Sequence, residues 1–307
     1  MDNSINPAGT GKDARRVTAF VVALLAFLTW SLNSGAIAAQ EKSLLWQVSR
    51  DDRSIFLLGS IHFLRKENYP LNQTILNALD ASKRLVLEID SNRTSGESAR
   101  RSTLERATYR DGTNLEQNVS PETYELASRR ANQLGLEIGV LNPMKPWFAA
   151  LTMVAIHLQR MGLDPQFGVD RYLAERAKSS GKPTSGLETL ESQLRILDQL
   201  SKRGQELMLR ETVGELERLD RDVNAIVQSW IKGDEDRLST LLLTEMQEYP
   251  ELYEKVLVER NRRWLADIEK LIEEGSGAMV VVGAAHLVGK DSVVAMLKAK
   301  GYSVKQW

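Results

Sequence analysis

Two histidines follow the same short pattern near opposite ends of the chain. Residues 55–66 read IFLLGSIHFLRK and residues 279–290 read MVVVGAAHLVGK. His62 and His286 therefore each stand three residues after a glycine that ends an apolar run. Such a run predicts a buried strand, and the glycine allows a sharp turn at its end. Because ligands bind at the carboxyl ends of strands in open α/β sheets, we expect both imidazoles to face one cleft.

A carboxylate stands late in a third apolar run. Residues 84–89 read RLVLEI, which places Glu88 near the end of another predicted buried strand. A buried carboxylate is costly unless it is paired or binds a cation. Two histidines and one carboxylate are suitable ligands for a divalent metal that keeps positions open for water and substrate. The pattern therefore predicts a metal site formed by His62, His286 and Glu88.

These residues also have structural interpretations. A buried histidine is commonly a hydrogen-bonded part of the core, and Glu88 could form a salt bridge to an arginine elsewhere in the chain. Arg260, in the segment LVERN at residues 257–261, either faces solvent or is buried and points at the carboxylates. A buried arginine there would stabilise a substrate carboxylate or a developing oxyanion.

Three further polar residues are expected to be structural. His157 stands on the flank of an apolar helical stripe and has no partner motif, which favours a place in the core or at its rim. Asp90 is expected to cap a helix or to face solvent. Glu188 is expected to mark the start of the next helix.

The elements expected to position these residues are strands at both ends of the chain and helices in its middle. Apolar runs predict strands at residues 44–48, 55–58, 84–89, 278–282 and 302–305. Helical spacing predicts helices at residues 72–82, 120–135, 147–161, 205–231, 234–248, 251–274 and 291–300. The polar stretch 94–118 is expected to be a solvated connector or a loosely packed helix.

This order predicts an α/β fold. We expect a central mixed, partly parallel sheet that is formed by the N- and C-terminal parts of the chain and flanked by helices. The sheet would belong to a single domain at residues 40–307, with an entirely helical insertion lobe at about 120–274.

The first 39 residues are expected to be an export signal rather than part of the fold. Basic residues between Lys12 and Arg16 precede an apolar stretch at 19–28, and small residues follow. This stretch is shorter than the roughly 20 residues of a membrane-spanning helix. A signal cleaved near Ala38 or Ala39 is therefore favoured over an uncleaved anchor. The protein is expected to be periplasmic or extracellular, and to contact a membrane only if this segment is retained.

Composition excludes several classes of protein and site. The 307 residues are 42% hydrophobic and 26% charged, which excludes a disordered or collagen-like chain. A net charge of −1 is too balanced for a general nucleic-acid binder. The chain has no cysteine, which excludes disulfides, thiolate metal ligands and cysteine nucleophiles. No Walker or Rossmann glycine-rich loop occurs, so no organic cofactor is expected.

Together, several motifs resemble the TraB/PrgY/GumN family, which also includes the Tiki proteins. Besides the two Gly-x-x-His units and Glu88, they are Phe167-Gly168-Val169-Asp170, Tyr172-Leu173, Gly181-Lys182-Pro183, the segment from Leu187 to Gln193 and the pair Arg260-Asn261. The resemblance covers residues 44 to 306 and implies an α/β sheet with a helical insertion, as in the similar erythromycin-esterase and ChaN-like folds. Tiki-type members are membrane-associated metallopeptidases that depend on a divalent cation such as manganese or cobalt. Their site positions correspond here to His62, His286 and Glu88, whereas for other relatives no reaction is established.

The residues and the resemblance lead to one main expectation and two alternatives. The main expectation is an exported metal-dependent hydrolase, most simply a peptidase, with manganese, cobalt or zinc held by His62, His286 and Glu88. Glu88 would serve as ligand or general base, and Arg260 would stabilise the oxyanion. One alternative is a metal-free, esterase-like hydrolase that uses one histidine as the base. The other is a non-catalytic protein that binds and sequesters a peptide.

Overall fold

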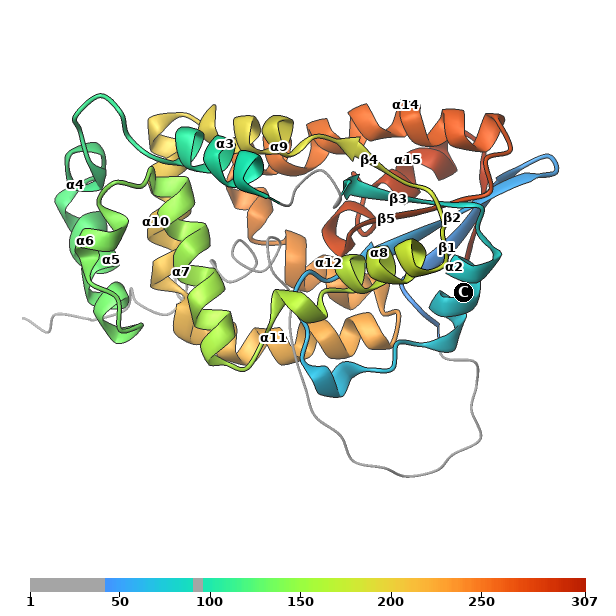
Figure 1. Ribbon diagram of the computed structural model, residues 1–307, viewed down its shortest axis with the longest axis horizontal. Coiled ribbons are helices and arrows are strands. Elements are labelled where there is room, and N and C mark those ends of the chain that lie inside the picture. Colours follow the sequence, from blue (N-terminus) through green and yellow to red (C-terminus); the bar gives the residue numbers. More distant parts are fainter. Residues whose placement is uncertain (1–41, 91–95) are drawn as a thin grey trace, which may run out of the picture.

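The computed structural model describes residues 42–90 and 96–307 and shows an α/β protein built around one sheet (Figure 1). In these residues, the strands stand in the order β4-β3-β5-β2-β1-β6. They are β1 (Leu45–Arg50), β2 (Arg53–Ser60), β3 (Arg84–Ile89), β4 (Thr184–Glu188), β5 (Ala278–Gly283) and β6 (Ser303–Gln306). β2, β5, β3 and β4 run parallel, whereas β1 pairs antiparallel with both β2 and β6. The expected α/β class, with a mixed sheet made by both ends of the chain, is confirmed.

β5 lies inside the sheet and joins the two parts of the chain that carry the predicted site. Its apolar sequence AMVVVG is buried almost throughout, as is typical of a parallel strand that is covered on both faces. Ser60 of β2 stands opposite Gly283 on one side, and Leu87 of β3 stands opposite Val281 on the other. The ends of β2, β3 and β5 therefore meet at one edge of the sheet.

Helices cover both faces of this sheet (Figure 1). α14 (Glu259–Glu273) and α15 (Val293–Ala299) lie on one side, and α2 (Gln73–Ala81) and α8 (Val169–Ser179) lie on the other. α14 contacts β1 and β2, while α8 contacts β3 and β4. A Cβ atom on Gly168, the N-cap residue of α8, would lie 2.5 Å from the His62 carbonyl oxygen, so the start of α8 lies next to a predicted site residue.

The other described α-helices make up the rest of the molecule. They are α3 (Glu97–Ala107), α4 (Leu115–Asn118), α5 (Pro121–Gln133), α6 (Ile138–Leu141), α7 (Pro146–Arg160), α9 (Leu190–Asp198), α10 (Lys202–Gly214), α11 (Leu216–Ile231), α12 (Glu235–Leu243) and α13 (Pro250–Leu252). α11 contacts the sheet, because Trp230 Nε1 donates to the Gly59 carbonyl of β2. A π-helical segment, η6 (Tyr253–Val258), joins α13 to α14. Both α5 and α7 pack against α10, and Figure 1 shows this group far from the strands.

The expectation of an entirely helical segment at about 120–274 is wrong. Residues 184–188 form β4, which pairs parallel with β3 at the edge of the sheet. β4 reads TSGLE and contains a single strongly apolar residue, so no apolar run marks it. Gly186 allows close approach of the two strands, because a Cβ atom there would lie 2.6 Å from the Asp90 nitrogen. The Thr184 hydroxyl donates a hydrogen bond to the Asp90 carboxylate at 3.4 Å.

Three helices expected from the periodicity are interrupted. The one expected at residues 234–248 consists of α12, which ends at Leu243, and a separate short helix, η5 (Met246–Glu248). Residues 205–231 belong to α10 and α11, which are separated at Glu215, next to Gly214, a residue with low helix propensity. The segment 251–274 contains the π-helical η6 before α14, so a period of 3.6 residues does not hold along it. In contrast, α3 buries only Ala107, as expected of a loosely packed helix.

The described residues contain no helix that is both long and apolar enough to cross a membrane. The expected export signal at residues 1–39 lies outside the described residues.

Candidate functional site

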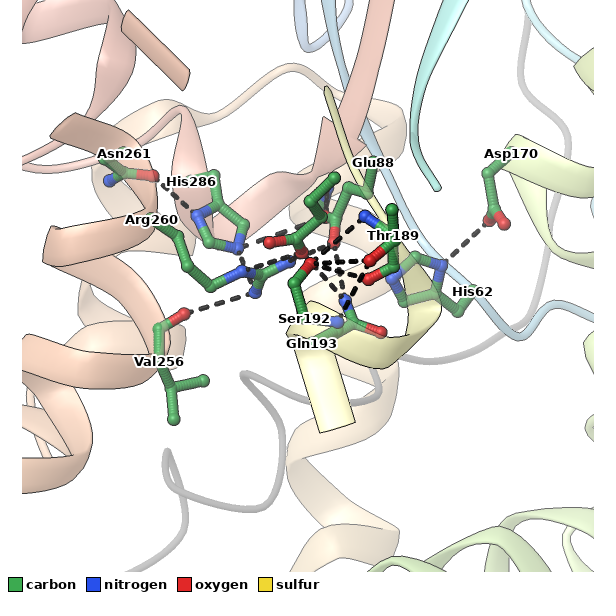
Figure 2. A network of polar contacts seen from close by, with 12 residues as sticks. His62, Glu88, Asp170, Thr189, Ser192, Gln193, Val256, Arg260, Asn261 and His286 are labelled. Carbon is green, nitrogen blue, oxygen red and sulfur yellow. Dashed lines mark hydrogen bonds and ion pairs between the residues drawn. The ribbon is translucent and has the colours of Figure 1, made fainter. Parts of the chain in front are cut away.

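The site residues predicted from the sequence come together at the carboxyl edge of the sheet (Figure 2). Glu88 stands near the end of β3, His62 follows β2, and His286 ends the short helix η7 (Ala284–His286) that follows β5. A Cβ atom on Gly283 would lie 3.2 Å from Glu88 Oε1, 3.7 Å from His286 Cδ2 and 3.8 Å from His62 Nε2. The Gly283 N–H donates to Glu88 Oε1 at 2.6 Å. Gly283 therefore provides the space around which the other three residues converge.

Both imidazole rings are held through Nδ1. His62 Nδ1 lies 2.9 Å from Asp170 Oδ1, and His286 Nδ1 lies 2.6 Å from Asn261 Oδ1. The Asn261 amide nitrogen donates to the carbonyl of Asp291, which directs the amide oxygen toward His286. Because carboxylate and amide oxygens only accept, each Nδ1 carries a proton and Nε2 is the atom that faces the site. Partners of this kind orient histidines that bind metals or act as bases.

The guanidinium of Arg260 lies at the centre of the network (Figure 2). Nη2 donates to Glu88 Oε2 at 2.5 Å and to Glu188 Oε1 at 2.6 Å, and Nε also donates to Glu188. Nη1 donates to His286 Nε2 at 3.0 Å. The ring of Trp264 packs against the guanidinium, with 4.5 Å between the ring centroid and Cζ. Arg260 is only 5% exposed, so the buried alternative, in which it faces the carboxylates, is confirmed.

Glu188 belongs to the site, although the sequence analysis did not predict it. The expectation that Glu188 begins a helix is wrong, because it ends β4 and α9 follows the N-cap residue Thr189. The side-chain amide of Gln193 lies 3.2 Å from Glu88 Oε2 and 3.4 Å from Glu188 Oε1. A Leu-Glu pair stands at the end of β4 and one residue before the end of β3, and this shared pattern is the signal that could have identified Glu188.

Asp170 and Asn261 are the other site residues that were given no role from the sequence. Both occur in the motifs that carry the family resemblance, but neither has a spacing that identifies its partner. Asp170 stands in the first turn of α8, and Asn261 is fully buried in α14. His157, expected outside the site, pairs with Asp220 on α11 at 2.8 Å.

The charges of the network determine its protonation. Burial opposes ionisation of Glu88, but Arg260 and a backbone amide lower its pKa to about 2. Burial and the Arg260 cation lower the pKa of His286 to about 3, so its ring is neutral. Burial also opposes protonation of His62, but the Asp170 carboxylate raises its pKa to about 9. The site therefore combines an ionised carboxylate, a neutral imidazole and an imidazole made basic by its partner.

A cavity of about 230 Å³ opens onto this network. His62, Glu88, Arg260, Gly283 and His286 line its polar end. Apolar side chains of α7, α9, η6 and the short helix η5 (Met246–Glu248) line the rest. A molecule in this cavity would contact imidazole, carboxylate and guanidinium groups together.

The types of donor in the site suit a divalent cation. Two imidazole Nε2 atoms and a carboxylate are ligands for zinc, manganese and cobalt, and both rings have the Nδ1 partners that such ligands need. His286 Nε2 already accepts a hydrogen bond from Arg260 Nη1, so its lone pair is not available to a metal in this arrangement. Within residues 42–90 and 96–307, no three His, Asp or Glu side chains already stand in ligating geometry. Metal binding therefore requires Arg260 to leave His286, while its two bonds to Glu188 can remain.

Comparison with known proteins identifies the family of the chain. The model of the TraB/PrgY/gumN family matches residues 44–306. The uncharacterized protein YbaP of Escherichia coli (strain K12) is 26% identical over 248 residues, which cover 80% of this chain and 89% of YbaP. An uncharacterized protein of Treponema pallidum (strain Nichols) is 22% identical over 302 residues, covering 91% of this chain and 89% of that protein. No solved structure matches. Because the family match includes both Gly-x-x-His turns and every strand of the described sheet, the chain belongs to the TraB/PrgY/gumN family.

Proposed function

We propose that the protein is an exported hydrolase of a peptide or related acyl bond, and that it works with a divalent cation held by His62, His286 and Glu88. One observation carries the proposal. His62 Nε2, Glu88 Oε1 and the His286 ring all lie within 3.8 Å of the point where a Cβ atom of Gly283 would stand. Manganese, cobalt or zinc bound there would supply a nucleophilic water at neutral pH and polarise the acyl oxygen.

The chain's own residues orient this chemistry. Asp170 and Asn261 hold the imidazoles so that Nε2 of each faces the cavity. Arg260 is held by Glu188, and its Nη1, once released from His286, would donate to an oxyanion on the acyl oxygen. The apolar walls of the cavity exclude water, which strengthens these charge interactions.

A second candidate is metal-free hydrolysis, and one contact favours it. Arg260 already donates to His286 Nε2, which leaves His62 as the imidazole with an uncommitted Nε2. His62 and Asp170 form a pair in which the carboxylate orients the ring and stabilises its protonated form. In this alternative Arg260 is the oxyanion donor and His62 is the general base. Turnover should then rise with pH toward the His62 pKa of about 9, because the protonated ring cannot accept a proton.

The decisive experiment measures metal content and hydrolysis in matched histidine variants. Purified protein, His62→Ala, His286→Ala and the control His157→Ala are each dialysed against trace manganese, cobalt and zinc. His157 is a suitable control because it also pairs with an aspartate but lies outside the site. Metal is measured by elemental analysis, and turnover by release of fluorescence from a library of quenched peptides, with and without a chelator.

The outcomes separate the candidates. About one equivalent of metal in the wild type and His157→Ala, absent from both site variants, supports the metal site. Turnover that is lost on chelation supports the metal-dependent reaction, whereas turnover that survives chelation and needs only His62 supports the second candidate. Saturable peptide binding without product under any metal would contradict both hydrolase candidates and indicate sequestration.

A further inference from the structure

The cavity at the candidate site has two chemically different walls. The network of His62, Glu88, Arg260 and His286 forms one end, at the edge of the sheet. The rest of the lining, called here the apolar wall, is apolar except for Gln193 and comes from helices that are distant from one another in the sequence. Its main side chains are Leu151 of α7, Leu194 and Leu197 of α9, Met246 of η5, and Val256 and Leu257 of η6. An occupant that reaches the polar network must therefore also place a part against an apolar surface.

The volume of the cavity limits what can occupy it. Its volume of about 230 Å³ exceeds the roughly 150 Å³ of an apolar protein cavity that holds one benzene molecule. It falls below the range of roughly 300–1,000 Å³ that is typical of sites for drug-sized ligands. The space therefore suits one group about the size of a large apolar side chain rather than a whole cofactor.

The charges of the lining residues exclude an anionic occupant. Arg260 is the only lysine or arginine among the lining residues of this described cavity, and it is already paired with both Glu88 and Glu188. The side-chain amide of Gln193 is also directed at these two carboxylates. His62, the other lining residue that can carry a positive charge near neutral pH, is likewise paired, with Asp170 at 2.9 Å. No uncompensated positive charge remains in the lining to repay the desolvation of a carboxylate or a phosphate.

We propose that the apolar wall binds a single uncharged apolar side chain, of about leucine or phenylalanine size, next to the bond that is cleaved. This inference rests on the proposed hydrolase function and specifies its substrate class. The apolar side chain lies between α7, α9 and η6, and the adjacent acyl carbon then lies beside Arg260 and the two histidines. Burial of the apolar group aligns the reacting bond with the polar network.

The test compares quenched peptides that differ only at the residue preceding the cleaved bond, which is leucine, glycine or aspartate. Leu151→Trp adds bulk to the cavity from α7, and Leu151→Ala enlarges the cavity. The matched control is Leu104→Trp, because Leu104 is 41% exposed on α3 and lies outside the cavity. Far-UV circular dichroism and urea unfolding establish that each variant is folded.

We expect kcat/KM for the leucine peptide to exceed that for the glycine and aspartate peptides by about tenfold or more. Leu151→Trp should lower the rate on the leucine peptide about tenfold more than the rate on the glycine peptide, and Leu104→Trp should change neither rate. Leu151→Ala, the more conservative change for folding, should shift the preference from leucine toward phenylalanine. Equal rates on all three peptides, faster cleavage of the aspartate peptide, or a leucine preference unchanged in folded Leu151→Trp would overturn the inference.

A binding measurement tests the apolar site independently of the proposed hydrolysis. Ligand-observed NMR is recorded with N-acetyl-leucinamide, N-acetylglycinamide and the aspartate analogue on the same variants. If no peptide is cleaved, the hydrolase proposal fails, but leucinamide binding that Leu151→Trp weakens and Leu104→Trp preserves would still support the apolar site. Absence of leucinamide binding, or equal binding of the aspartate analogue, would overturn it.

Discussion

Gly283→Ala tests whether the site depends on the space above Gly283. The glycine has φ −52° and ψ 138°, a conformation that alanine also adopts, so the substitution introduces no backbone strain. The new Cβ would lie 3.2 Å from Glu88 Oε1, just inside the roughly 3.3–3.6 Å of a relaxed C···O contact. The Glu88 carboxylate must therefore shift by a few tenths of an ångström, although Arg260 and the Gly283 amide hold its two oxygens.

This shift should affect function more than stability. Misplacement of a reacting group by about 1 Å costs roughly 100-fold in rate, so we expect Gly283→Ala to lower kcat/KM by about 10- to 100-fold. The methyl group meets the end of one side chain at the edge of a cavity. We therefore expect the free energy of unfolding to fall by less than about 1 kcal/mol.

The equivalent glycine of the first Gly-x-x-His unit provides the control. A Cβ on Gly59 would lie 2.5 Å from Leu44 Cδ2 and 3.1 Å from Ala284 Cα, inside the packed core. Gly59→Ala should therefore lower the free energy of unfolding by about 1–3 kcal/mol. Urea unfolding followed by circular dichroism, metal content and peptide turnover are measured for both variants. A loss of stability in Gly283→Ala as large as that in Gly59→Ala, or wild-type turnover and metal content in Gly283→Ala, would show that the site does not depend on the space above Gly283.

Two other variants test the partner of a site histidine and a carboxylate outside the site. Asp170→Ala removes the hydrogen-bond acceptor of His62 Nδ1 and should lower metal affinity or turnover by about 10- to 100-fold. Metal affinity is measured by calorimetry and turnover by kinetics, and unchanged values of both would contradict the role of Asp170. Glu206 accepts from the Ser120 N–H and the Thr123 hydroxyl, so Glu206→Ala should cost about 1–3 kcal/mol in urea unfolding at pH 7. These hydrogen bonds lower the pKa of Glu206 in the folded state. Its contribution is therefore fully present above the unfolded pKa of about 4.3 and is lost as the pH falls through the lower folded value. A difference between wild type and Glu206→Ala that persisted at pH 2 would exclude this cause.

The sequence was sufficient where a buried element has a strong local pattern. The apolar runs at β2, β3 and β5 predict strands because strands buried on both faces need continuous apolar side chains. Their order in the sheet could not be predicted in the same way, since β5 enters between β2 and β3 from more than 180 residues away. β4 was missed because it is a short edge strand whose register depends on backbone contact at Gly186 rather than on apolar residues.

A helical sequence pattern alone does not predict whether Arg260 is buried or faces solvent. Arg260 and Asn261 are adjacent in the sequence, and both are buried, at 5% and 0% exposure. A regular helix with a single apolar face does not predict two consecutive buried polar residues. The π-helical η6, which precedes them, changes the angular phase between Val256 and Arg260. The Val256 carbonyl then accepts from Arg260 Nη1, which turns the guanidinium back toward the sheet.

One contact of Arg260 distinguishes the two candidate reactions. Its guanidinium stands between two buried carboxylates, Glu88 and Glu188, and burial raises the pKa of Glu188 despite this pairing. Two carboxylates that share one cation leave an excess of negative charge. This excess favours either protonation of one carboxylate or binding of a second cation in the same network. If a divalent cation binds Glu88 and His286, Arg260 stays paired with Glu188. Its Nη1, released from His286, can then donate a hydrogen bond to the oxyanion. If Arg260 keeps His286, only His62 retains an imidazole nitrogen for base catalysis. The hydrogen bond from Arg260 to His286 is therefore the interaction that must break in one reaction and persist in the other.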